Sequence, residues 1–197
     1  MTKILNMLSK EEIASFIKDG GVGVLPTDTL YGLVCSAALP NAIARLYALK
    51  HREQKPGTVI AANIDQIVQL GIPKRYLTAI EQFWPNPISV VIPVGDHLKE
   101  LHSGKGSVAF RIPKDETLRA LLEQTGPLLT SSANHPGETP AATVADAKTY
   151  FGGSIDFYVE GGDLSTNKPS TVIRMVDDAV EVLREGAVEV TERGEIL

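Results

Sequence analysis

Short β-branched runs alternate with amphipathic stretches along the chain, and this alternation limits the fold more than any other feature. Five runs bounded by Gly or Pro are predicted to be strands: VGVLPT, TVIAA, ISVVIPV, SVAFRIP and PLLTSS. Helices are predicted from Ser9 to Gly20, from Pro40 to Leu49, across PKRYLTAIEQFW, from about Asp115 to Gln124 and from Thr143 onward. Strands that alternate with helices are typical of an α/β fold.

The last part of the chain has a different pattern. Three strand candidates, DFYVEGG, STVIRMV and AVEVLRE, follow one another with turns between them and no helix. Consecutive strands joined by turns favour antiparallel pairing. We therefore expect an α/β protein with a mixed sheet.

Length and charge narrow the class of protein. A chain of 197 residues is long enough for one core, so we expect a single domain over residues 1–197. A net charge of −5 argues against a surface that binds nucleic acid everywhere. The single Cys35 cannot form an internal disulfide, and neither a signal-peptide h-region nor a membrane-length apolar run is present. These features predict a cytoplasmic protein without a membrane partner.

Four segments change from an apolar strand or a helix into small polar or charged residues: PTDTLYG, KHREQKPG, RIPKD and TSSANHPGETP. Ligands of open α/β sheets commonly bind in the crevice at strand ends. These four segments are therefore the candidate site.

The segment KHREQKPG contains three cations within six residues, Lys50, Arg52 and Lys55. If the helix has ended by Leu49, Lys50 and Arg52 lie on one side of an extended segment and can hold a polyphosphate. The alternative is that these cations complement the negative end of the preceding helix.

The segment TSSANHPGETP is rich in hydroxyl groups and could aim backbone N–H groups at an anion. Its candidate residues are Thr130, Ser131, Ser132, Asn134 and Thr139. A capping loop before the helix at Thr143 would have a similar composition. The chain contains neither the G-x-x-x-x-G-K-[ST] phosphate loop nor a G-x-G-x-x-G after a strand, so a nucleotide would bind by another architecture.

The segment PTDTLYG offers Thr27, Asp28 and Thr29 either to a small polar ligand or to a turn that closes the strand connection. The four histidines lack metal-ligand spacing, so we expect no metal site. Cys35 is interpreted as a core residue, and no G-x-S-x-G elbow supports a hydrolase.

Seven motifs together point to one family. PTDTLYGL, LKHREQKP, FWPNPISVVIP, VAFRIP, TSSANHPGE, PSTVIR and LREGAV occur in this order between about Leu25 and Val188. In order and spacing they resemble the YrdC-type threonylcarbamoyl-AMP synthases, in the single-domain bacterial form. The resemblance implies a twisted mixed sheet flanked by helices, with a concave, positively charged cavity.

The resemblance also implies an activity. Such enzymes make threonylcarbamoyl-AMP and pyrophosphate from L-threonine, bicarbonate or CO₂, and ATP with Mg²⁺, for threonylcarbamoyladenosine modification of tRNA. Partner proteins of tRNA modification would then accept the adenylate. With no activated nucleophile, catalysis would consist of positioning and electrostatic stabilisation.

Site residues follow from motif positions. The family's signature residues, implied to be catalytic, fall on Lys50, Arg52, Ser132 and Asn134. ATP contacts are implied for Arg52, Lys55, Ser107, Ser132, Thr139 and Arg184, with Lys50 also facing the phosphates. Threonine contacts are implied for Thr29, Arg111, Thr130 and Ser170. Two alternatives stay open: a module that binds structured RNA in ribosome maturation, and an enzyme that forms a carbamoyl-adenylate from carbamoyl phosphate.

Overall fold

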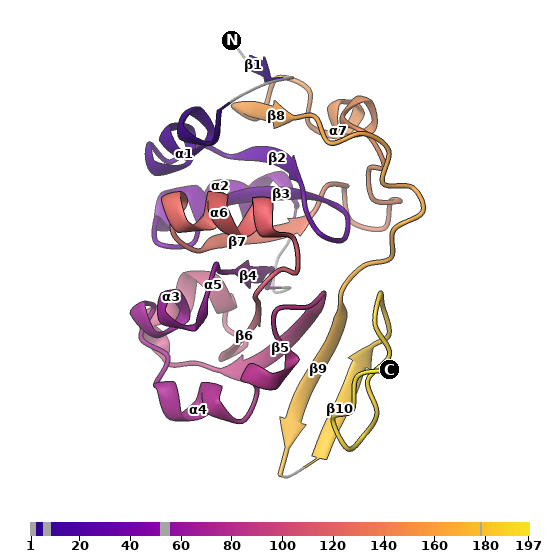
Figure 1. Ribbon diagram of the computed structural model, residues 1–197. Helices are drawn as coiled ribbons and strands as arrows, with labels where there is room; N and C mark the ends of the chain where they lie inside the picture. The colour runs from indigo at the N-terminus through magenta and orange to yellow at the C-terminus, as the bar shows by residue number, and fades with distance from the viewer. Residues whose placement is uncertain (1–2, 6–8, 52–55, 178) are drawn as a thin grey trace.

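The computed structural model describes residues 3–5, 9–51, 56–177 and 179–197. Within these residues, one ten-stranded sheet runs in the order β1-β8-β2-β3-β7-β4-β6-β5-β9-β10 (Figure 1). The strands are β1 Lys3–Leu5, β2 Gly23–Pro26, β3 Tyr31–Ser36, β4 Thr58–Ile60, β5 Ile88–Pro93, β6 Ser107–Arg111, β7 Leu128–Ser132, β8 Phe157–Val159, β9 Thr171–Val176 and β10 Ala179–Arg184. The prediction of an α/β fold with a mixed sheet is confirmed.

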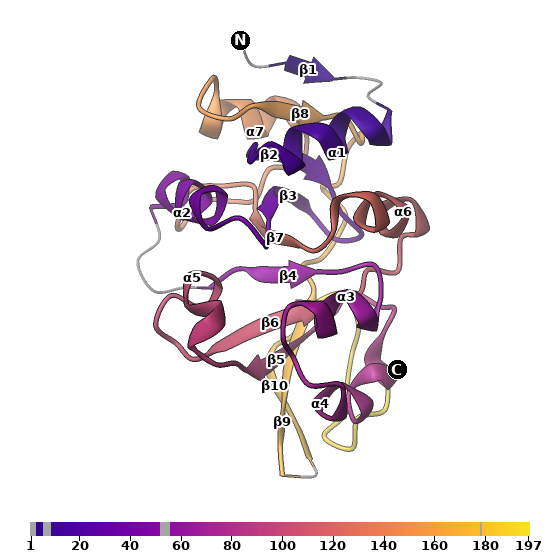
Figure 2. The same cartoon turned by 90° about the vertical axis from the view of Figure 1, so that its left-hand side faces the viewer.

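Helices cover both faces of the sheet. They are α1 Lys10–Lys18, α2 Pro40–Leu49, α3 Ile64–Gln69, α4 Lys74–Thr78, α5 Lys99–His102, α6 Glu116–Thr125 and α7 Val144–Phe151, with 3₁₀ turns at Glu81–Phe83 and Asp96–Leu98. The second view places α1 and α6 on one side of the central strands and α2 and α7 on the other (Figure 2). None of the helices described in the structure is long and apolar enough to cross a membrane.

The predicted helix starts are confirmed by their caps. Ser9 forms a capping box with Glu12, and Thr143 forms one with Asp146. The Asp115 side chain accepts a hydrogen bond from the Leu118 amide at the start of α6. Because each cap satisfies an amide that the helix leaves unpaired, these starts could be read from local sequence. The stretch PKRYLTAIEQFW is only partly helical, since α4 ends at Thr78 and a 3₁₀ turn follows.

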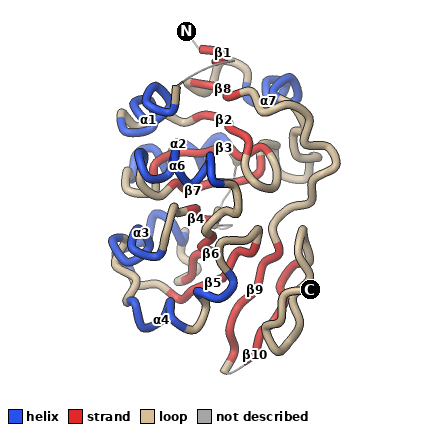
Figure 3. The backbone as a smooth tube through the Cα atoms, in the orientation of Figure 1, coloured by secondary structure: helices blue, strands red, loops and turns tan. Residues whose placement is uncertain are grey.

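The pairing of the C-terminal strands differs in part from the prediction. β9 and β10 pair antiparallel as expected, but β8 pairs parallel with β1 and β2. After Val159 the chain does not turn back; it runs as a long loop to Thr171 at the start of β9, in the other half of the sheet (Figure 3). The expectation of three antiparallel strands is therefore wrong for β8.

The central strand β3 was not predicted. Each of its six residues is buried, so the strand lacks the alternation of a half-exposed strand. Its first two residues, Tyr31 and Gly32, also look like the end of a polar turn in the sequence. The strand lies between β2 and β7, so the polar loops that end its neighbours converge on its start.

Two apolar clusters stabilise the two faces. One joins Ile13 and Ile17 of α1 with Leu121 and Leu122 of α6 over the central strands. The other is larger and contains α2, α7 and the strands of the second half. Burial on both faces fixes the central strands, so the loops at their ends are held by a rigid core.

Candidate active site

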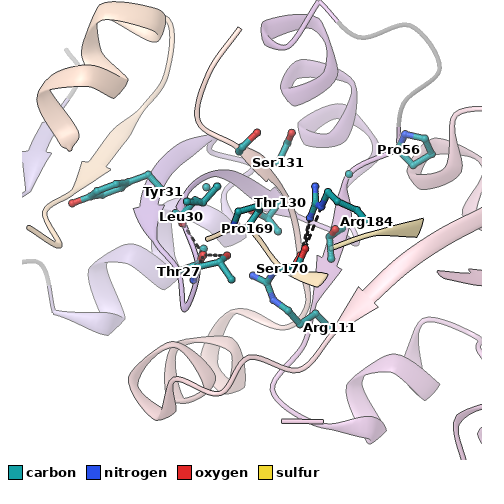
Figure 4. Close-up of a pocket in the computed structure, with 15 residues that line it drawn as sticks. Thr27, Leu30, Tyr31, Pro56, Arg111, Thr130, Ser131, Pro169, Ser170 and Arg184 are labelled. Atoms are coloured by element: carbon teal, nitrogen blue, oxygen red, sulfur yellow. Dashed lines mark hydrogen bonds between the residues drawn. The ribbon is translucent and has the colours of Figure 1, made fainter. Parts of the chain in front are cut away.

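A polar cavity of about 140 Å³ lies where the strand ends meet (Figure 4). It is lined by Thr27, Thr29, Leu30, Tyr31, Gly32, Pro56, Gly57, Thr58, Arg111, Thr130, Ser131, Ser132, Pro169, Ser170 and Arg184. These residues come from the loop between β2 and β3, from the first residues of β3 and β4, from the ends of β6, β7 and β10, and from the segments that lead into β4 and β9. All four polar segments identified in the sequence therefore contribute to the site or to its immediate support.

Thr130 stands between two glycines of neighbouring segments. A Cβ atom at Gly32 would lie 2.5 Å from Thr130 Oγ1, and one at Gly57 would lie 2.6 Å from the Thr130 carbonyl oxygen. Any side chain at either position would displace Thr130, because such separations are shorter than van der Waals contact. The two glycines thus permit the close approach of three segments at the cavity wall.

Arg111 is the cation at the end of β6, and it is paired with Asp28. Its Nη2 lies 3.0 Å from Asp28 Oδ1, and the two side chains are only 4% and 5% exposed. Burial lowers the pKa of the Arg111 guanidinium, while the charge of Asp28 acts in the opposite direction. Arg111 stays charged, since its ordinary pKa lies far above neutrality.

The loop before β3 is held by threonine hydroxyls. Thr27 Oγ1 donates to the Leu30 carbonyl at 2.7 Å and lies 3.0 Å from Thr29 Oγ1. The Thr29 amide donates to Thr27 Oγ1 at 3.2 Å. The sequence left open a turn or a ligand site at this segment. The hydroxyls form the turn, and both threonines also line the cavity.

Ser170 and Arg184 form another part of the cavity wall. Arg184 Nη2 donates to the Ser170 carbonyl at 2.7 Å and to Ser170 Oγ at 3.1 Å, and Ser89 Oγ donates to Ser170 Oγ at 3.0 Å. The Ala187 amide donates to the Pro169 carbonyl at 2.8 Å, which ties the LREGAV motif to the PSTVIR motif. These bonds bring residues from two separate motifs to one place.

Lys50 is placed differently from the expectation. It is the C-cap of α2 in helical conformation, and His51 follows with φ 45°, so the segment is not extended at these residues. The Lys50 side chain is fully buried, and its ammonium donates to the carbonyl oxygens of Ser132 and Asn134 and to Asn134 Oδ1. Lys50 therefore holds residues 131–134, which we call the SSAN loop. Arg52 and Lys55 lie outside the described residues.

Asn134 completes this loop. Its Oδ1 accepts from Ser132 Oγ at 2.7 Å, and its Nδ2 donates to the carbonyls of His135 and Glu138. The side chain therefore has partners on both its oxygen and its nitrogen, and it does not line the cavity. Lys50 and Asn134 together fix Ser132, and Ser132 does line the cavity.

The described part of the chain contains neither a cluster of metal-ligand side chains nor an accessible thiol. No group of three His, Cys, Asp or Glu side chains there is arranged to hold a metal ion. Cys35 is buried in β3, and burial raises its pKa to about 12. The interpretation of Cys35 as a core residue is confirmed.

Comparison with known proteins assigns the family. The family model described as Sua5_yciO_yrdC, telomere recombination, matches residues 15–186. The chain belongs to the Sua5/YciO/YrdC family. It is 33% identical over 163 residues to a threonylcarbamoyl-AMP synthase of Marinobacter nauticus, which covers 80% of this chain and 86% of that protein. The family resemblance stated from the seven motifs is confirmed.

A longer relative has a solved structure. The threonylcarbamoyl-AMP synthase of Pyrococcus abyssi is 29% identical over 98% of this chain, which spans 60% of that protein. The crystal structure of P. abyssi Sua5 complexed with L-threonine matches with a TM-score of 0.84 and 28% identity, covering 96% of this chain and 59% of that chain. The Sua5/YrdC fold, a large twisted sheet flanked by helices, is thus confirmed for this chain.

The cavity gathers some of the family-implied residues and not others. All four residues implied for threonine, Thr29, Arg111, Thr130 and Ser170, line it, as do Ser132 and Arg184 from the ATP set. Ser107 lies at the start of β6, and Thr139 is exposed in the loop before α7 with its carbonyl accepting from Tyr150; neither is part of the described lining. Sequence reasoning missed the role of Asp28, whose position in a threonine-rich turn gave no sign of a partner 83 positions away at Arg111.

Proposed function

We propose that this protein is an L-threonylcarbamoyladenylate synthase that forms threonylcarbamoyl-AMP and pyrophosphate from L-threonine, bicarbonate or CO₂, and ATP, for tRNA modification. One observation carries the proposal: four side chains that the family motifs assign to threonine, from four separate segments, line one cavity. The relatives named threonylcarbamoyl-AMP synthase support the same reaction.

The size of the cavity suits the amino acid. Its volume of about 140 Å³ is well below the roughly 300–1,000 Å³ of pockets that enclose drug-sized ligands. Threonine fits such a space, whereas ATP has to extend out of it past Ser132 and Arg184. The cavity is thus the amino-acid end of a longer site, and the family-implied contacts at Ser107 and Thr139 belong to the nucleotide end.

The chemistry follows from the charges and hydroxyls. Arg111 suits the threonine carboxylate, because guanidinium and carboxylate pair strongly and bidentately. The threonine amine then captures CO₂, and the resulting N-carboxylate attacks the α-phosphorus of ATP as pyrophosphate leaves. Arg184 and the family-implied Arg52 stabilise the charge that grows on the phosphate oxygens.

Magnesium enters with the nucleotide in this proposal. No carboxylate stands in the described lining, and the adjacent Asp28 is paired with Arg111, so the described chain offers no cage for the ion. Mg²⁺ commonly stays on substrate phosphates with several waters. MgATP is therefore treated as the substrate.

The test is pyrophosphate release from MgATP and bicarbonate by the purified protein, with and without L-threonine. The proposal expects release that depends on threonine, with serine a poor substitute. Release that depends on carbamoyl phosphate would identify carbamoyl-adenylate chemistry. A folded protein with no release in either case, and with salt-dependent binding of structured RNA, would favour the RNA-binding alternative.

A further inference from the structure

The Asp28–Arg111 pair contains two buried polar atoms that lack a hydrogen bond. Asp28 Oδ1 lies 3.0 Å from Arg111 Nη2, yet neither Asp28 Oδ1 nor Arg111 Nε has a hydrogen-bond partner, and both atoms are shielded from solvent. The contact is therefore a charge pair without aligned hydrogen bonds. Such atoms are costly in a folded protein, so each calls for a physical reason.

Asp28 is itself held from behind. The Lys114 amide donates to Asp28 Oδ2 at 3.2 Å. The carbonyls of Pro113 and Lys114 in turn accept hydrogen bonds from Arg119 Nη1 of α6, each at 2.7 Å. A continuous network thus runs from α6 through the segment after β6 to the Asp28 carboxylate, and from there to Arg111 at the cavity wall.

We infer that Asp28 is a positioning residue for Arg111, which holds the guanidinium at the cavity wall in the orientation that binds the carboxylate of the amino-acid substrate. This inference rests on the proposed function and deepens it. A guanidinium has five N–H donors in a planar fork, and Asp28 engages one end of it through Nη2. A carboxylate that enters the cavity meets a guanidinium whose orientation is already set.

Asp28 also balances the charge of Arg111 at the cavity wall. A buried cation without a counter-ion would be costly. With Asp28 in place, the charge of Arg111 is balanced, so a substrate carboxylate binds best where it meets the guanidinium with good geometry. The pair thereby couples affinity for the substrate carboxylate to the orientation of one guanidinium.

The test compares two isosteric variants by calorimetry, with L-threonine and MgATP titrated separately. Asp28→Asn removes the carboxylate charge that holds Arg111. Asp156→Asn is the matched control, because Asp156 pairs with Arg45 at 2.5 Å in another aspartate–arginine pair whose residues do not line the cavity. We expect Asp28→Asn to weaken threonine binding on the order of 10- to 100-fold, as a misplaced binding group does, with MgATP affinity unchanged. Asp156→Asn leaves both affinities unchanged.

A second ligand separates positioning from direct contact. 3-Hydroxybutyrate carries the carboxylate and the hydroxyl of threonine but no amine. If Asp28 acts through Arg111, Asp28→Asn weakens the binding of 3-hydroxybutyrate as well as that of threonine. A loss of affinity confined to threonine would mean that Asp28 contacts the amine, and would overturn the positioning role.

Folding and function are controlled separately. Asp28→Glu keeps the charge but shifts the carboxylate by one methylene, and we expect it to weaken threonine binding in a folded protein even if Asp28→Asn does not fold. Unchanged threonine affinity in either folded variant would overturn the inference alone. Wild-type protein that binds no threonine would instead overturn the proposed function, and the role of Asp28 with it.

Discussion

Replacing Lys50 by Met separates two roles for this residue. Met keeps an unbranched stem of similar length and removes the ammonium that donates to the Ser132 and Asn134 carbonyls and to Asn134 Oδ1. If the buried Lys50 ammonium holds the SSAN loop, as its complete burial indicates, the substitution destabilises the folded protein. If Lys50 instead acts only on substrate phosphates, the free protein keeps its stability.

The size of the effect follows from which acceptors lose their partner. Asn134 Oδ1 keeps Ser132 Oγ at 2.7 Å, and the Ser132 carbonyl keeps the Asn134 amide at 3.0 Å. The Asn134 carbonyl loses a charge-assisted hydrogen bond, and an unsatisfied buried acceptor costs ~1–3 kcal/mol. Relief of the buried charge offsets part of the total loss. We expect a net destabilisation of about 1–3 kcal/mol, which for a chain of this size lowers Tm by about 2–12 °C.

The assay is thermal and urea unfolding without ligands, beside Lys74→Met as control. Lys74 is an exposed lysine at the start of α4, so its replacement controls for the loss of a charge. We expect a lower Tm for Lys50→Met and an unchanged Tm for Lys74→Met. If both variants keep the wild-type Tm and activity is lost only in Lys50→Met, the structural role is refuted. Lys50 would then act on the substrate phosphates.

Three further predictions follow from the cavity and the core. Gly32→Ala places a methyl group 2.5 Å from Thr130 Oγ1 and is expected to raise the threonine KM on the order of 10-fold; an unchanged KM would show that Thr130 can move without loss. Arg184→Ala removes the donor to the Ser170 carbonyl and hydroxyl, so steady-state kinetics should show weaker use of both threonine and ATP; an effect on one substrate only would place Arg184 at one end of the site. Burial raises the pKa of Cys35 to about 12, so the native thiol should not react with a thiol reagent at pH 8 but should react fully in denaturant. Because the pKa of Cys35 is higher in the native state than in the unfolded state, the native state binds this proton more tightly. The resulting contribution to the free energy of unfolding is complete below pH 9 and declines as pH rises toward 12.

Local signals in the sequence predicted most elements but only part of their pairing. The capped helices could be read because Ser9, Asp115 and Thr143 satisfy amides within three residues of themselves. The neighbours of β8 could not, because its parallel pairing with β2 joins segments more than 130 residues apart and leaves no local pattern. The fully buried β3 was missed for the related reason that burial on both faces removes alternation.

The site also contains features that the sequence identified and contacts that it did not show. Residue types and motif order identified the polar segments and the residues that line the cavity, including Arg111 and Thr130. They did not show that Lys50 points into the SSAN loop or that Asp28 pairs with Arg111, because both contacts depend on how distant segments approach one another. The glycines at positions 32 and 57 were the available sign of that approach, and their meaning is clear only beside Thr130.

The most direct test of the central claim is mass spectrometry of the nucleotide product formed from MgATP, L-threonine and ¹³C-bicarbonate. The account predicts an adenylate that contains threonine and one ¹³C atom, formed together with pyrophosphate and lost in Arg111→Ala protein that remains folded. An adenylate that forms without threonine, that takes its carbon only from carbamoyl phosphate, or that is made equally well by Arg111→Ala would contradict it.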